Sequence, residues 1–126
     1  MTTSIESYDE IEITTDVMSA SHHRLIQLML NKGLQQLELA KYGIAHNDMT
    51  LKLSAINKAQ NITDYLQLCL NRDDEKTKEL ASKLDDCYTF ILQALGNANK
   101  QHNALFIEQA KKVMLNLKEG WDGINP

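Results

Sequence analysis

Apolar residues recur every three or four positions along most of this chain, which is the spacing of one buried face on an α-helix. Short polar breaks divide the pattern into four stretches, at about residues 22–46, 48–71, 78–99 and 103–120. The breaks carry residue types that begin or end helices, including Asp48, Asn99 and Asn103. The pattern therefore predicts four amphipathic helices, with Asn47 or Asp48 as the cap of the second, Asn103 as the cap of the fourth and Asn99 as a left-handed end.

Each predicted helix has one apolar face that we expect to form the core. The faces are Ile26, Met29, Leu30, Gly33, Leu37, Ala40 and Ile44; Ala55, Ala59, Ile62, Leu66, Cys69 and Leu70; Leu80, Leu84, Cys87, Tyr88, Ile91, Leu95 and Ala98; and Phe106, Ile107, Ala110, Val113, Met114, Leu117 and Trp121. Long helices with short connections pack as antiparallel neighbours. We therefore predict an all-α fold, an antiparallel up-and-down four-helix bundle, as one domain over residues 1–126.

Residues 1–20 precede the helical pattern and lack its periodicity. Ile11 and Ile13 alternate with charged residues there, and Tyr8 adds an aromatic side chain. We interpret this segment as an extended N-terminal strap in which Tyr8 and Ile11 are anchors. The alternative is a disordered tail.

The predicted helices carry more apolar residues than one core can accept. Outside or beside the core faces lie Leu25, Leu28, Leu39, Tyr42, Leu53, Ile56 and Phe90. Taken singly, each is explained as an exposed apolar residue or a contact at the edge of the bundle. Taken together, they predict grooves that accept amphipathic helices from a partner.

Charge and hydropathy exclude two classes of partner. The net charge is −4 and the basic residues are scattered, whereas nucleic-acid binding needs a positive patch that displaces counterions. No apolar run approaches 18 residues, so we expect no membrane insertion. The segment before Asp16 is polar and acidic, which is untypical of a secretory signal.

Cys69 and Cys87 lack metal-ligand spacing and are interpreted as small buried apolar residues in a reducing cytosol.

The pattern of reactive residues predicts no enzyme, no cofactor and no metal. None of the four histidines follows a glutamate by three positions, as the di-iron helix bundles require. The five glycines are isolated, so no phosphate-binding loop is present. A histidine phosphotransfer module is an alternative bundle of this size, but it needs an exposed histidine in the middle of a helix. The histidines here lie at predicted helix ends and breaks.

Three blocks of residues resemble the flagellar secretion chaperone FliS family over about residues 8–124. They are Ser19-Ala20-Ser21 with Leu25, Ile26, Leu28, Met29 and Leu34; residues 57–62 with Leu66, Leu70 and Asn71; and residues 79–84 with Tyr88, Leu95, Ala98, Asn99 and Trp121-Asp122. The chain departs from the family pattern in three places. His22 replaces a proline, residues 30–33 lack the family's aromatic, and Cys87 replaces a leucine.

This resemblance implies a cytosolic export chaperone. Such a protein binds the disordered C-terminal segment of flagellin, prevents premature polymerisation and delivers the subunit to the flagellar type III export gate, which it contacts transiently. In the family the N-terminal strap lies over the empty groove, which would be the role of Tyr8 and Ile11 here. The alternative function is that of a chaperone or regulator of another exported flagellar protein, such as an anti-sigma factor. Whether the unliganded protein forms weak homodimers stays open.

Overall fold

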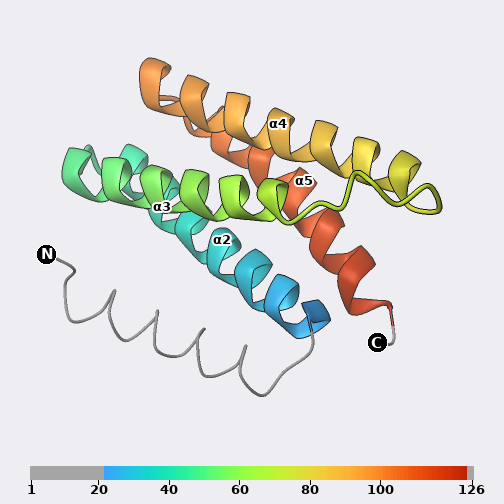
Figure 1. The fold of residues 1–126 in the computed structure, drawn as a ribbon. Coiled ribbons are helices and arrows are strands. Elements are labelled where there is room, and N and C mark those ends of the chain that lie inside the picture. The colour runs from blue at the N-terminus through green and yellow to red at the C-terminus, as the bar shows by residue number, and fades with distance from the viewer. Residues whose placement is uncertain (1–21, 125–126) are drawn as a thin grey trace, which may run out of the picture.

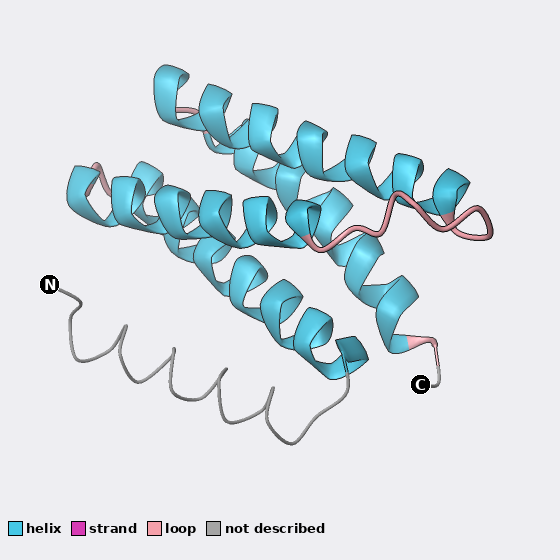
Figure 2. Ribbon diagram, viewed as in Figure 1, coloured by secondary structure: helices cyan, strands magenta, loops and turns pink. Residues whose placement is uncertain are grey.

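Residues 22–124 are described by the computed structural model, and four helices make up most of this part of the chain (Figures 1 and 2). The helices are α2 (His22–Ala45), α3 (Met49–Leu68), α4 (Lys78–Gln101) and α5 (Ala104–Asp122). The predicted strap, with Tyr8 and Ile11, lies outside the described residues.

The helices form a four-membered ring of antiparallel neighbours. Helix α2 packs against α3 and α5, and α4 packs against the same two helices, whereas within residues 22–124 the diagonal pairs have no Cα atoms within 8 Å of each other. In Figure 1, α3 and α4 run across the view and α2 and α5 cross them diagonally. The predicted all-α, antiparallel bundle is confirmed for the described residues.

The two ends of the bundle differ. At one end, which we call the short-turn end, the chain reverses between α2 and α3 and between α4 and α5 (Figure 2). At the other end, the long-loop end, residues 69–77 join α3 to α4, and α2 begins and α5 ends nearby (Figure 1).

The core consists of aliphatic side chains together with Tyr88. All seven residues predicted for the first helix face are buried, and Leu30, Leu37 and Ala40 are completely buried. Burial of each large apolar side chain contributes about 1.5–3 kcal/mol, so this face alone accounts for much of the driving force for folding. The prediction that Leu80 is in the core is wrong, because it is 57% exposed in the first turn of α4, where it borders a hollow at the end of the bundle.

The helix ends follow the predicted chemistry in part. Asn103 accepts a hydrogen bond from the backbone N–H of Leu105, which confirms that cap prediction. Of the two candidates for the cap of α3, Asn47 and Asp48, it is Asp48 that accepts a hydrogen bond, from the backbone N–H of Leu51. The prediction for Asn99 is wrong: α4 continues to Gln101, and His102 adopts the left-handed conformation with φ of 50°. Helix α3 ends at Leu68, three residues before its predicted end.

A buried lysine joins the two turns at the short-turn end. Lys52 is 5% exposed, and its Nζ donates to the backbone oxygen of Asn99 at 3.0 Å and to His102 Nδ1 at 3.1 Å. Because an ammonium group can only donate, Nδ1 is the acceptor and His102 Nε2 carries the proton. Nε2 then donates to Asn47 Oδ1 at 3.0 Å. The chain of bonds therefore ties the left-handed residues Asn47 and His102 together.

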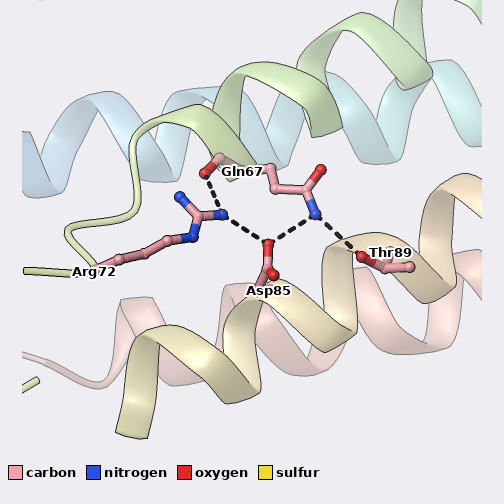
Figure 3. Close-up of polar contacts among 4 residues, drawn as sticks. All are labelled: Gln67, Arg72, Asp85 and Thr89. Atoms are coloured by element: carbon pink, nitrogen blue, oxygen red, sulfur yellow. Dashed lines mark hydrogen bonds and ion pairs between the residues drawn. The ribbon is translucent and has the colours of Figure 1, made fainter. Parts of the chain in front are cut away.

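A second polar cluster joins α3 to α4 at the long-loop end (Figure 3). Asp85 Oδ1 accepts from Gln67 Nε2 and from Arg72 Nη2, both at 2.8 Å, and Gln67 also donates to Thr89 Oγ1. The hydrogen bond from Gln67, followed by the bond and the charge of Arg72, lowers the pKa of the Asp85 carboxyl. These contacts hold the start of the 69–77 loop against α4.

Helices α2 and α3 approach closely at Gly43. A Cβ atom added there would lie 2.7 Å from the backbone N of Lys52 and 3.0 Å from its Cα, so α3 would have to shift. Gly96 differs, because no atom lies within 4 Å of an added Cβ atom. The two glycines therefore offer a matched pair of substitutions inside helices.

We expect Gly43→Ala to destabilise the protein by about 1–3 kcal/mol, because the new methyl group meets backbone rather than a flexible side chain. We expect Gly96→Ala to stabilise it by about 0.5–1 kcal/mol, since alanine restricts the unfolded chain and fits the open space. Urea denaturation of both variants measures the difference. Equal effects of the two substitutions would contradict the close packing of α2 on α3.

The hydrogen bonds to Asp85 predict that the stability of the fold depends on pH in the acidic range. Since the pKa of Asp85 is lowered in the folded protein, its contribution is present above about pH 4, the unfolded value, and is lost as pH falls through the folded-state pKa. The midpoint of urea denaturation should therefore fall less between pH 6 and pH 3 in Asp85→Asn than in the unmodified chain. Asp86→Asn, at the exposed neighbouring position, is the control and should behave as the unmodified chain does.

Candidate functional site

Within residues 22–124, the structure contains neither a metal-binding group of histidine, cysteine, aspartate and glutamate side chains nor a helix able to cross a membrane. Cys69 and Cys87 are free and half-buried. What this part of the chain does present is apolar surface. The large apolar side chains exposed on the four helices are Leu39, Tyr42, Met49, Leu53, Tyr65, Leu68, Leu80, Phe90, Leu105 and Leu115. A surface of this kind is typical of a protein that binds other proteins.

The C-terminal half of α2 carries a shallow hollow of about 750 Å³. It is lined by Gln35, Glu38, Leu39, Lys41, Tyr42, Ala45 and His46. The Tyr42 ring, 55% exposed, stacks on the His46 ring with centroids 3.9 Å apart. His46 Nδ1 donates to the backbone oxygen of Tyr42 at 3.0 Å, which fixes the orientation of the imidazole. The stacked rings and Leu39 form an apolar surface at the end of α2; we call this the α2 hollow.

A second hollow, of about 470 Å³, lies on α5 and is called here the α5 hollow. It is lined by Leu105, Glu108, Gln109, Lys111, Lys112 and Leu115. Leu105 is 67% exposed, and both leucines lie outside the face that α5 buries in the core. The long side chains of Lys111 and Lys112 can cover a guest with their methylene groups while their charges stay in water.

Two ion pairs form a ridge between these hollows. Lys41 of α2 pairs with Glu108 of α5, and Lys111 of α5 pairs with Glu38 of α2, each at 2.7 Å. The hydrogen bond between Lys41 and Glu108 raises the pKa of Lys41 and lowers the pKa of Glu108. Each hollow is lined by one residue from each ion pair, so the ridge is the wall that the two hollows share. The α2–α5 face is therefore one surface with two apolar hollows.

The structure separates the residues predicted for the groove. Leu39 and Tyr42 line the α2 hollow, and Leu28 is half-buried on the same helix. Leu53 and Phe90 are 45% and 42% exposed, but they lie on α3 and α4.

Leu25 and Ile56 belong to the core, where they are 9% and 1% exposed. The expectation that they lie at the surface is corrected, because neighbouring helices cover them. Tyr8 and Ile11 lie outside the described residues.

Leu105 and Leu115 were missed by the sequence analysis, although a signal was available. Each is next to a core residue, Phe106 or Met114, and lies to one side of the apolar face of its helix. Such residues widen the apolar arc in the same way as Leu53 does on α3. Their position beside α2 depends on which neighbour α5 has in the ring of helices.

Comparisons with known proteins identify the family. The sequence model of the family described as "Flagellar protein FliS" matches residues 4–126. The chain is 32% identical over 121 residues to flagellar secretion chaperone FliSB of Pseudomonas aeruginosa, which covers 96% of this chain and 94% of that protein. It is 32% identical over 122 residues to flagellar secretion chaperone FliS of Salmonella typhimurium, with 97% and 90% coverage, and 23% identical over 123 residues to that of Vibrio cholerae, with 98% and 89%. Because the match extends over nearly the whole chain and its helical pattern, this protein belongs to the FliS family of flagellar secretion chaperones.

Proposed function

We propose that this protein binds the disordered C-terminal segment of flagellin in the cytosol and holds it as amphipathic helices on the α2–α5 face. The bound chaperone conceals surfaces that flagellin uses to polymerise, and the complex is delivered to the flagellar export gate. The observation that supports this site is the pair of apolar hollows on either side of one ion-paired ridge.

The dimensions of the α2–α5 face suit a helical guest. The side chains from Leu28 to Tyr42 extend over about 21 Å of α2, at 1.5 Å per residue. An amphipathic helix of about four turns has this length and presents apolar residues at every third or fourth position. Such a helix in the α2 hollow would cover Leu39 and Tyr42, which are the most exposed apolar residues of α2.

The ion-paired ridge is compatible with a guest that covers it and separates two guest segments. Each of its four charges already has a partner across the α2–α5 interface, so a guest that covers the ridge does not bury an unpaired charge. A guest with two helical segments can occupy both hollows, because their shared wall keeps the segments apart. The ordering of a disordered segment costs about 2–5 kcal/mol, and burial of about 1,000–3,000 Å² offsets that cost.

Titration of the purified protein with a peptide of the flagellin C-terminal segment tests the partner. We expect an equimolar complex by calorimetry and a gain in helical circular dichroism above the sum of the two components, since the guest folds on binding. Absence of a complex at roughly 50 μM of each component would contradict the proposed function.

Substitution of Tyr42 tests the site. Tyr42→Asp should weaken binding of the flagellin peptide by about tenfold or more, because a charge replaces an apolar anchor. Thermal stability should change little, since Tyr42 is 55% exposed. Leu68→Asp is the matched control: Leu68 is 82% exposed on α3, away from both hollows, and its substitution should leave binding unchanged. Equal losses in the two variants would move the site away from the α2–α5 face.

A further inference from the structure

A third hollow lies at the long-loop end of the bundle, at the opposite end of α2 from the α2 hollow. Its volume is about 350 Å³, and residues of all four helices and of the connecting loop surround it. The apolar walls are Ile26, Leu66, Leu70, Leu80, Ala81, Leu84 and Trp121. The ring of His23 lies against Trp121 with centroids 5.2 Å apart, which holds the indole at the rim. We call this the end hollow.

One polar group that lines this hollow has no hydrogen-bond partner among the described residues. Tyr88 is 2% exposed and lines the end hollow, yet its hydroxyl makes no hydrogen bond within the part of the chain that the structure describes. Burial, with smaller contributions from Cys87 and Cys69, raises the pKa of Tyr88 to about 12. The hydroxyl is therefore protonated at neutral pH and can donate a hydrogen bond. Within residues 22–124 this oxygen is not one of the fully enclosed polar atoms that lack a partner, so it borders the open space of the hollow, where water or an acceptor group of a ligand can pair with it.

The mouth of the end hollow is acidic. Asp74 lines it, and Asp73 and Glu75 lie beside Asp74 in the exposed 69–77 loop. None of these three carboxylates takes part in an ion pair with another described residue. Arg72, a cation of the same loop, pairs with Asp85 of α4 instead. The other cation of the loop is Lys76, so with Arg72 paired to Asp85 the loop has three carboxylates against one lysine and presents a net negative charge next to an apolar opening.

We propose that the end hollow is a second binding site of this protein, which accepts a large apolar side chain of a partner protein from a segment with basic residues beside it. The apolar walls take the side chain, the Tyr88 hydroxyl donates to a carbonyl oxygen of the partner, and the acidic loop attracts the flanking basic residues. The volume lies within the range of ligand sites but holds only a small group, which favours an anchor residue over a whole helix. The site does not depend on where flagellin binds.

The test uses the full chain and three capped pentapeptides: Ala-Lys-Phe-Lys-Ala, Ala-Glu-Phe-Glu-Ala and Ala-Lys-Ala-Lys-Ala. Trp121 is the only tryptophan, so its fluorescence reports on the hollow, and amide NMR shifts locate the site. We expect the first peptide to bind with Kd on the order of 1 mM and to shift Trp121 and residues 80–88. The second and third peptides should bind at least about fivefold more weakly, since each lacks one element of recognition.

Two variants separate binding from structure. Ala81→Phe fills the hollow and should abolish binding of the first peptide, whereas Ser82→Phe adds the same bulk at the exposed neighbouring position and should leave it unchanged. Tyr88→Phe should weaken binding about three- to tenfold without loss of thermal stability, because its hydroxyl has no partner in the free protein. Tyr88→Phe keeps the test decisive if Ala81→Phe fails to fold.

Several outcomes would overturn the proposal. These are absence of any shift at the highest peptide concentration, equal binding of the acidic peptide, or unchanged binding in Tyr88→Phe. Binding of free phenol as tight as that of the first peptide would assign the hollow to a small molecule instead. Shifts of the same residues that depend on protein concentration alone would assign it to a second copy of the chain.

Discussion

The position of α2 between α3 and α5 is the packing constraint on which the rest of this structure depends. The buried face of α2, from Leu25 to Ile44, supplies nine core positions, and Gly43 lets the backbone of α3 approach at its C-terminal end. Because a helix can bury only part of its circumference in a ring of four, the opposite side of α2 must face outward. Leu39 and Tyr42 lie on that side, so the packing that stabilises the fold also exposes the apolar surface that a chaperone needs.

The pair formed by α3 and α4 is held in a different way. Its two ends carry the polar links of the bundle: Lys52 reaches Asn99 and His102 at the short-turn end, and Gln67 reaches Asp85 at the long-loop end. Directional bonds of this kind set the register of two helices more strictly than apolar contact does, since a shift by one residue would break them. The loop that carries the acidic mouth of the end hollow is therefore placed by the Asp85 cluster.

The proposed division of labour follows from these two arrangements. The α2–α5 face has a wide, shallow surface and paired charges, which suits a long guest that folds as it binds. The end hollow is smaller, has apolar walls and a tyrosine hydroxyl, and lies beside a loop of net negative charge, which suits a single apolar anchor flanked by basic residues. A family member with two sites of different chemistry can hold an unfolded subunit and contact another protein at the same time.

The sequence by itself determined the four helices, the cap at Asn103, a cap at Asn47 or Asp48 and the core face of α2, because these depend on spacing and on residues a few positions apart. It also indicated the surplus of apolar residues, and the match of its blocks indicated the family. Only the tertiary structure decided which of these residues are exposed: Leu25 and Ile56 are covered by neighbouring helices, whereas Leu80, Leu105 and Leu115 are not. The burial of Lys52, the ridge from Lys41 to Glu108 and the end hollow around Tyr88 likewise join residues far apart in the chain. The local periodicity of the sequence indicates which side of a helix is apolar, but the packing of all four helices determines which neighbour covers that side.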